Sequence, residues 1–288
     1  MSHRTAPLVA VLAGIATGVA MFVGHFYADI ATQNISPAAV PWFNAADDAI
    51  DTLQGVLPAF IAGWLARRTA VVVGLAVGVL GGLALPFLNA LLLGDDSTLH
   101  TDLTPHLASL LCCGALTGAI AGTAAAFARG RHDMPTVSMD PPKFGAFVFA
   151  ALCGVLTYLG LFLVNFFASK AMLDPSPQWD AWCTALLNFL ATLAEVMPAF
   201  VAGWLAQRRG LTLGVVLGVL GGFAAPQAIA ALTGHPAHFA QGVFPLIASL
   251  ASSGAINGAL AGMAGQRLRS NARSRRFLTE LLRVESGR

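Results

Sequence analysis

A small set of polar side chains lies inside or beside apolar runs of the sequence, where polar groups are unusual. Because such groups are costly inside a bilayer, those that occur there commonly mark an ion pathway, a proton relay or a ligand site. Carboxyl groups could bind a cation or carry a proton, and imidazole, hydroxyl and amide groups could hydrogen-bond the same solute. The set predicts a polar vestibule for transport and consists of Glu195, Thr192, Asn188, Asp51, Gln54, His25 and Asn165.

Glu195 is the clearest member of this set. The apolar run that contains it ends near Gln207, which places Glu195 about 18 Å from that boundary at a helical rise of about 1.5 Å per residue. No Lys or Arg lies at that depth in any predicted span. We therefore expect the carboxyl group to be protonated, to be hydrogen-bonded or to face a wet cavity. Both a functional carboxyl group and a structural hydrogen bond between helices remain open.

Other polar residues are predicted to lie at about the same depth in the membrane as Glu195. Thr192 and Asn188 precede Glu195 by three and seven residues, a spacing that puts them on one helix face. In the earlier segment, Asp51 and Gln54 lie on an overlapping face, and His25 and Asn165 occupy matching positions in two other runs. For Asp47, Asp48 and Asp51 a plainer explanation is available, since acids in the first turn of a helix are stabilised by its dipole.

A predicted loop rich in His and Asp holds weaker candidates. His100, Asp102 and His106 combine imidazole and carboxylate groups, which suit Zn²⁺, Mn²⁺ or Ni²⁺. Their spacing follows no established ligand pattern, and the later copy of the loop has Ala240 and Leu246 in place of the two histidines. A solvated acidic loop is the simpler interpretation, so we expect no metal and no other cofactor.

An internal repeat determines the elements that must position these residues. The segment 57–82, LPAFIAGWLARRTAVVVGLAVGVLGG, returns at 197–222 as MPAFVAGWLAQRRGLTLGVVLGVLGG, an offset of 140 residues. The same offset relates Gly14 to Gly154 and Trp42 to Trp182 without a gap. Because internal repeats decide the architecture, the chain is predicted to hold two copies of one unit.

Composition sets the class of protein. The chain of 288 residues is 56% apolar and 10% charged, with a mean hydropathy of +0.71, whereas soluble domains carry about 25% charged residues. A run of about 20 apolar residues crosses about 30 Å of hydrocarbon. Such runs occur at 7–27, 50–66, 70–93 and 106–127, and again at 147–167, 190–206, 211–232 and 246–265. We predict an all-α integral membrane protein with eight transmembrane helices, built as two tandem parallel four-helix repeats.

The predicted organisation has four parts. They are a first four-helix repeat at 1–132, a cytoplasmic linker at 133–144, a second repeat at 145–266 and a basic cytoplasmic tail at 267–288. Residues 28–46 are predicted to be a polar, proline-rich connector in water or at the interface. The four cysteines form no spaced framework and are expected to be free thiols.

Charge sets the predicted orientation. With the N-terminus in the cytoplasm, every Lys and Arg except Lys170 falls on the cytoplasmic side, as short cytoplasmic segments require. We therefore predict a multi-pass protein of a bacterial inner membrane with both termini in the cytoplasm. Since each copy has an even number of helices, the two halves should be related by an axis along the membrane normal.

Glycine recurs every fourth residue on one face of the third and fourth predicted helix of each copy. Small residues let membrane helices approach closely, so we predict close packing at a glycine zipper. The positions are Gly74, Gly78, Gly82, Gly114, Gly118, Gly122, Gly214, Gly218, Gly222, Gly254, Gly258 and Gly262. Proline inside a helix removes a hydrogen bond, so kinks are predicted at Pro58, Pro86, Pro198 and Pro226.

Two classes of function remain open. The chain is either a permease or channel for a small cation or polar solute, or a non-transporting accessory or scaffold subunit. The second class would bind lipid, another membrane protein or a further copy of this chain through its glycine faces. No catalytic signature such as a zincin helix, a P-loop or a CxxC pair is present, so we expect no enzyme. The arginine-rich tail is expected to meet anionic lipid, and no nucleic acid is expected.

Overall fold

Helices account for the secondary structure of the described part of the chain. The computed structural model describes residues 6–32, 36, 39–66, 69–93, 103–132, 144–172, 177–206, 209–233, 248–249 and 251–268. An all-helical fold is thereby confirmed for these residues. The helices are α1 (Ala6–Thr32), α2 (Val40–Ala66), α3 (Ala70–Leu93), α5 (Leu103–His132), α6 (Phe144–Ala171), α7 (Pro177–Leu205), α8 (Gly210–Thr233) and a C-terminal helix at residues 251–268.

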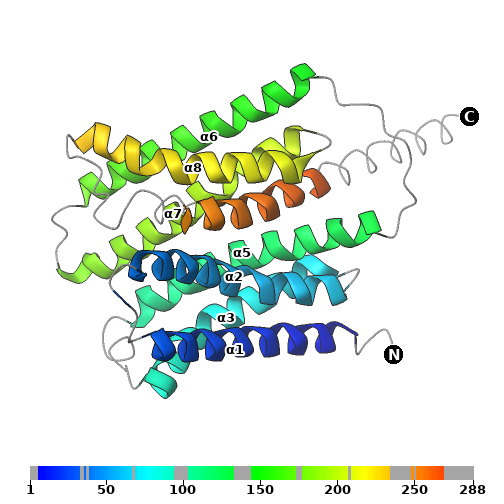
Figure 1. Ribbon diagram of the computed structural model, residues 1–288, viewed down its shortest axis with the longest axis vertical. Helices are drawn as coiled ribbons and strands as arrows, with labels where there is room; N and C mark the ends of the chain where they lie inside the picture. Colours follow the sequence, from blue (N-terminus) through cyan, green and yellow to red (C-terminus); the bar gives the residue numbers. More distant parts are fainter. Residues whose placement is uncertain are drawn as a thin grey trace, which may run out of the picture.

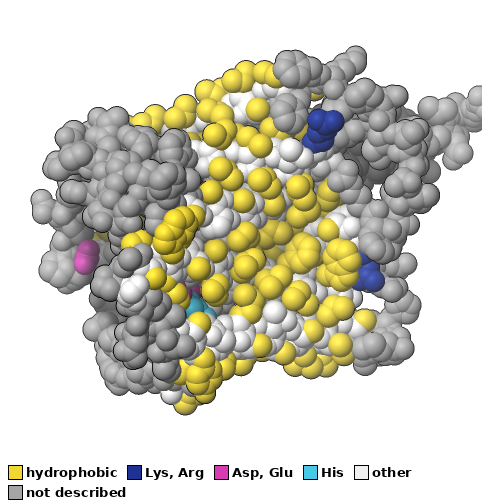
Figure 2. All heavy atoms as spheres, viewed as in Figure 1, with side chains coloured by type: hydrophobic (Ala, Val, Ile, Leu, Met, Phe, Trp, Pro, Cys, Tyr) yellow, Lys and Arg dark blue, Asp and Glu magenta, His cyan; other side chains and the backbone are white. Residues whose placement is uncertain are grey.

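Membrane character follows from the length and surface of these helices. Five of them, α1, α2, α5, α6 and α7, hold spans long and apolar enough to cross a membrane, with mean hydropathy from 1.3 to 2.2. In α3 and α8 the described apolar segments are shorter, at Ala70–Ala84 and Gly210–Gly221. Large apolar side chains such as Val72 and Leu91 are exposed, and Figure 2 shows a broad hydrophobic band between the two ends of the molecule. The protein is therefore a multi-pass membrane protein by these criteria.

The helices lie side by side and alternate in direction (Figure 1). One end of the bundle, here called the basic end, carries Arg129, Arg209 and Arg267 beside the start of α1. The opposite end, here called the acidic end, carries Asp47, Asp48 and Asp180. On the face drawn in Figure 2, Lys and Arg side chains lie at the basic end, and His and acidic side chains lie toward the acidic end. In Figure 1, α1 and α6 form opposite edges of the bundle.

Helix α2 begins earlier than the sequence pattern predicts. Residues 40–46 were expected in a connector, but the helix starts at Val40, and Pro41 is tolerated because the first turn needs no N–H from it. The first turn of α2 holds no acidic residue, so the prediction that Asp47 and Asp48 sit there for the helix dipole is wrong. In the same way α7 starts at Pro177, well before the predicted run at 190–206.

Backbone contact between α3 and α5 forms the closest packing in the first half. A Cβ atom added at Gly78 would lie 2.0 Å from the carbonyl oxygen of Gly114, and one at Gly74 would lie 2.5 Å from that of Gly118. Corresponding contacts join α8 and the C-terminal helix, where a Cβ at Gly218 would lie 1.8 Å from the oxygen of Gly254. A side chain at any of these positions requires the helices to move apart.

Small residues fill the half of the bundle nearer the basic end. Ile120 of α5, Val196 of α7 and Leu260 of the C-terminal helix share one apolar cluster, which joins the two halves. Arg129 donates a hydrogen bond to the carbonyl oxygen of Trp64 at the end of α2. The core here is therefore closely packed, and its alanines, none more than 1% exposed, are Ala10, Ala59, Ala62, Ala121, Ala124, Ala125, Ala150, Ala199, Ala202, Ala261 and Ala264.

Several predictions fall on residues outside the described part of the chain. The linker at 133–143 and the tail at 269–288 belong to this group. Pro86, Gly222 and Pro226 fall within α3 and α8, but their surroundings are outside the described part. Pro58 and Pro198 lie inside α2 and α7 as predicted, and all four cysteines are free.

Candidate functional site

Two cavities lie between the helices, from the middle of the bundle toward the acidic end. The first cavity, of about 590 Å³, is lined by α1, α2, α3 and α5. The second cavity, of about 510 Å³, is lined by α6, α7, α8 and the C-terminal helix, with three residues from α2. Pro58 and Gly78 line the first cavity, and Pro198 and Gly218, each 140 positions later, line the second.

The helices around the two cavities make matching contacts. A Cβ added at Gly14 of α1 would meet the side chain of Ala62 at 2.8 Å and the carbonyl oxygen of Pro58 at 2.9 Å. A Cβ added at Gly154 of α6 would meet the oxygen of Pro198 at 3.0 Å and the side chain of Ala202 at 3.1 Å. Gly14 and Gly154, 140 positions apart, therefore approach residues that are themselves 140 positions apart, and the two cavities can be compared position by position.

Glu195 gives the second cavity its chemistry. The carboxylate Oε2 accepts a hydrogen bond from Nδ2 of Asn257 on the C-terminal helix, at 3.3 Å. Asp48 and Asp51 contribute two further acidic side chains to the lining, which contains no Lys or Arg among the described residues. Hydroxyl and amide groups complete the polar part of the lining, at Thr52, Tyr158, Asn165, Ser249 and Ser253.

One polar atom beside the second cavity lacks a partner. Oδ1 of Asn165 is buried and accepts no hydrogen bond from the protein. Buried polar groups normally have a partner, and losing one costs about 1–3 kcal/mol. An unsatisfied amide oxygen at a cavity wall is suited to a bound donor or cation.

Tyr158 occupies part of the same space. Its hydroxyl donates a hydrogen bond to the carbonyl oxygen of Gly221 at 2.9 Å. Its ring lies against that of Phe162, with ring centres 6.2 Å apart and planes 22° apart. The phenol ring is therefore fixed at both its face and its hydroxyl.

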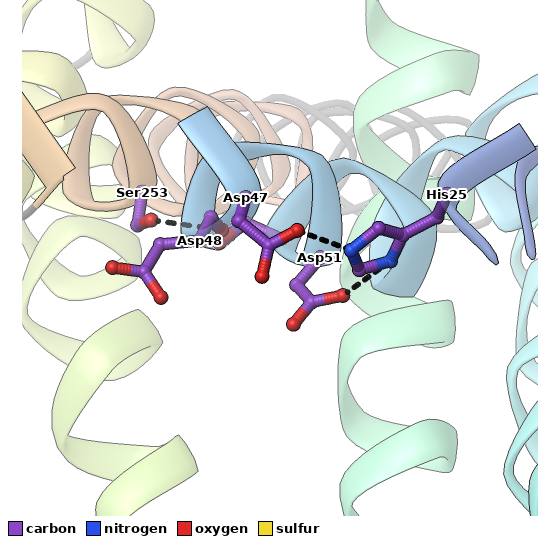
Figure 3. A network of polar contacts seen from close by, with 6 residues as sticks. His25, Asp47, Asp48, Asp51 and Ser253 are labelled. Carbon is purple, nitrogen blue, oxygen red and sulfur yellow. Dashed lines mark hydrogen bonds and ion pairs between the residues drawn. The ribbon is translucent and has the colours of Figure 1, made fainter. Parts of the chain in front are cut away.

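His25 joins α1 to the acidic side chains of α2 (Figure 3). Its Nε2 contacts the carboxylate of Asp47, and its Nδ1 lies 3.1 Å from Oδ1 of Asp51. Both ring nitrogens face oxygen acceptors, and only the imidazolium form has two N–H donors. The geometry therefore suits a charged His25 held between two carboxylates. The two carboxylates lie at opposite ring nitrogens, so the three residues form one cluster, which is an ion-pair cluster when His25 is protonated.

Polar contacts also join the two halves at this level. Ser249 donates to the carboxylate of Asp48, and Ser253 donates to the backbone oxygen of Asp48 at 3.3 Å (Figure 3). On the other side of the interface, Oγ1 of Thr192 donates to Sγ of Cys113 at 3.3 Å. The second helix of each half thus contacts the fourth helix of the other half.

The predicted residues divide between several places. Glu195 and Asn165 line the second cavity, Gln54 lines the first, and Asp51 lines both. Thr192 instead faces Cys113 of α5, and Asn188 is exposed, so neither joins Glu195 in the described lining. The spacing rule put these three on one broad face, but that face is divided between the cavity and the interface with α5. His25 lies in the ion-pair cluster with Asp47 and Asp51.

Sequence reasoning missed Asn257, Tyr158, Ser249 and Ser253. A signal for two of them was present in the repeat, because Tyr158 stands where the first copy has Gly18, and Asn257 stands where it has Thr117. A polar or bulky residue at only one of two equivalent positions marks a place where the halves differ.

The chain matches no protein-family model, no curated protein and no solved structure. Among the described residues, no group of three or more His, Cys, Asp or Glu side chains could hold a metal ion. The weak metal candidates His100 and Asp102, and the side chain of His106, lie outside the described residues.

Proposed function

We propose that this protein is a permease for a small cation or a polar solute that carries a positive charge. The observation that carries the proposal is the second cavity, where Glu195, Asp48 and Asp51 line a space of about 510 Å³ without a described basic residue. Acidic groups at the depth of a membrane span attract and desolvate cations, and they repel anions. Asn257 and the free amide oxygen of Asn165 offer neutral ligands beside the carboxyl group.

The proposal includes a topology of eight membrane spans in two parallel copies. The matching contacts of Gly14 and Gly154 support equivalent helix arrangements in the two halves. In Figure 1, α1 and α6 run in the same direction, which supports a relation about the membrane normal. The basic end faces the cytoplasm of a cell with an inner membrane, and the acidic end faces outward.

Transport through the second cavity requires the closely packed part of the bundle near the basic end to open. The cavities occupy the middle and the acidic-end side, whereas alanine and glycine fill the side nearer the basic end. The proposal therefore includes entry of the solute to Glu195 from the acidic end. Release at the basic end requires a second conformation, as in alternating access between two repeats.

The deciding experiment measures uptake into vesicles that contain the purified protein. Methylammonium, Rb⁺, glycerol and chloride serve as probes of organic cations, metal cations, neutral solutes and anions. We expect saturable uptake of at least one cation and none of chloride, with the cation signal abolished by Glu195→Gln. Absence of uptake for all probes, in vesicles where a co-reconstituted control transporter is active, would overturn the proposal. That result would favour the accessory or scaffold class.

A further inference from the structure

Two of the positions at which the cavities differ exchange a large side chain for glycine. Tyr158 and Glu195 both line the second cavity, and the first copy has Gly18 and Gly55 at the equivalent positions, which both line the first cavity. Two side chains are therefore missing from the same region of the first cavity. The first half retains a space with room for a phenol ring.

The groups that hold the Tyr158 ring have counterparts around this space. Tyr158 donates to the oxygen of Gly221 and lies against Phe162, and the equivalents of these two residues are Gly81 and Phe22. Both equivalents line the first cavity. A Cβ added at Gly81 would meet nothing within 4 Å, whereas one at Gly221 would lie 3.2 Å from the Tyr158 ring. The first half therefore has the carbonyl group of Gly81 and the ring of Phe22, but it has no side chain that corresponds to the phenol of Tyr158.

A second polar feature points into the same cavity. Oε1 of Gln54 is buried without a hydrogen-bond partner, and Gln54 and Asp51 both line the first cavity. Their equivalents in the second half are Ala194 and Ala191, so the second half supplies no acceptor at these positions. Gln54 lines the first cavity, and Asp51 lines both cavities. An apolar cavity with a few placed acceptors is the usual form of a small-molecule site.

We propose that the first cavity binds a small planar aromatic molecule that carries a hydroxyl or amino donor, such as a phenol or an aromatic amine. The ring takes the place that Tyr158 fills in the second half, against Phe22. Its donor bonds to the carbonyl oxygen of Gly81, and a second donor, where the molecule has one, reaches Gln54 or Asp51. This site lies in a different cavity from Glu195, although Asp51 lines both, and it does not depend on transport.

Substitution at Gly18 can test the proposal with the full chain. A Cβ at Gly18 would make only ordinary contacts, 3.5 Å from Cγ of Pro58, and Gly18→Tyr would supply a ring from a position that lines the first cavity. Gly24→Tyr is the matched control, because Gly24 lies on the same helix with nothing within 4 Å of its Cβ position and does not line the cavity. Tyr158→Gly makes the reverse change in the second half.

The measurement uses 4-fluorophenol as the probe and ¹⁹F NMR of protein in nanodiscs, with empty nanodiscs to correct for partition into lipid. We expect saturable binding to the unsubstituted protein and to Gly24→Tyr, and binding at least about tenfold weaker in Gly18→Tyr. Fluorobenzene, which lacks the donor, should bind about fivefold more weakly than 4-fluorophenol, since one hydrogen bond contributes about 1 kcal/mol. Tyr158→Gly should add a second saturable site.

Three results would overturn this proposal. The first is the absence of saturable binding to the unsubstituted protein, as expected when a lipid chain fills the cavity. The second is equal binding to Gly18→Tyr and Gly24→Tyr, and the third is equal or stronger binding of fluorobenzene. If Gly18→Tyr does not fold, failure of Tyr158→Gly to add a second site contradicts the proposal by itself. Each of these results leaves the cation-uptake test of Glu195 unaffected.

Discussion

Glu195 on α7 and Asn257 on the C-terminal helix face each other across the second cavity, joined by a hydrogen bond of 3.3 Å. The bond is long for an amide donor and a carboxyl acceptor, whose usual distance is about 2.9 Å. A carboxylate offers about four acceptor positions, so one amide leaves the others accessible from the cavity. Because the two residues come from different helices, the distance between their side chains depends on how α7 and the C-terminal helix pack.

The first prediction concerns the charge of Glu195. Glu195→Gln keeps the shape and the hydrogen bond to Asn257, so thermal stability should stay nearly unchanged while cation uptake into vesicles is lost. Asp180→Asn is the matched control, because Asp180 is an exposed acid in the first turn of the same helix, outside the cavity lining. Uptake that survives in Glu195→Gln would show that the carboxyl group has a structural role only.

Much of the fold was accessible from the sequence because membrane helices depend on local apolar runs. Helix α3 has the predicted bounds of 70–93, and the apolar runs in α1, α5 and α6 were also found. The start of α2 was missed, since Pro41 and Asn44 looked like connector residues although the first turns of a helix tolerate both proline and polar side chains. Local composition therefore locates the middle of a helix better than its ends.

The candidate site was only partly accessible from the sequence. Glu195 and Asp51 were found because a carboxyl group in an apolar run is unusual on its own. The contact of Glu195 with Asn257 joins residues 62 positions apart, and only tertiary packing brings them together. Thr192 was assigned to the vestibule from its spacing, but the neighbouring α5 decides which side of that face is cavity and which is interface.

The second prediction tests the contact between α3 and α5. Gly78→Ala should lower the unfolding temperature in detergent clearly, because the new Cβ would lie 2.0 Å from the Gly114 oxygen. Overpacking of this kind costs about 1–3 kcal/mol. Gly81→Ala, on the same helix, should be neutral because nothing lies within 4 Å of its Cβ position. Equal unfolding temperatures of the two variants would contradict this packing.

The third prediction concerns the polar contact between the halves. Asp48→Ala and Ser249→Ala each remove the hydrogen bond from the Ser249 hydroxyl to the Asp48 carboxylate, and Ser249 is only 8% exposed. A double-mutant cycle of unfolding free energies should give a coupling of about 0.5–2 kcal/mol, the usual range for hydrogen bonds between membrane helices. Additive effects of the two substitutions would mean that this bond does not stabilise the interface.

The fourth prediction uses the proximity of Thr192 and Cys113. Oγ1 of Thr192 lies 3.3 Å from Sγ of Cys113, so Thr192→Cys should form a disulfide with the native thiol under mild oxidation. Cys112, Cys153 and Cys183 are first replaced by serine, and a protease site is inserted in the segment 133–143. After cleavage, the two halves should stay joined on a non-reducing gel and separate on a reducing gel.

The control for this cross-link adds Cys113→Ser to the same protein. That variant lacks the native thiol and should separate into two fragments under both conditions. Halves that separate without reductant in the Thr192→Cys protein, under oxidation that closes a known disulfide, would contradict the contact between α5 and α7.

The contact between α3 and α5 also limits which parts of the molecule can move. Glycine backbones approach closely at several successive turns, so sliding one helix along the other would lose this match between glycines and opposing carbonyls. We therefore expect α3 and α5 to move together as one rigid unit, and likewise α8 and the C-terminal helix. Helices α1 and α6, at the two edges of the bundle in Figure 1, make close backbone approaches at Gly14 and Gly154. A tilt of either helix at this approach would change the width of the cavity that it lines.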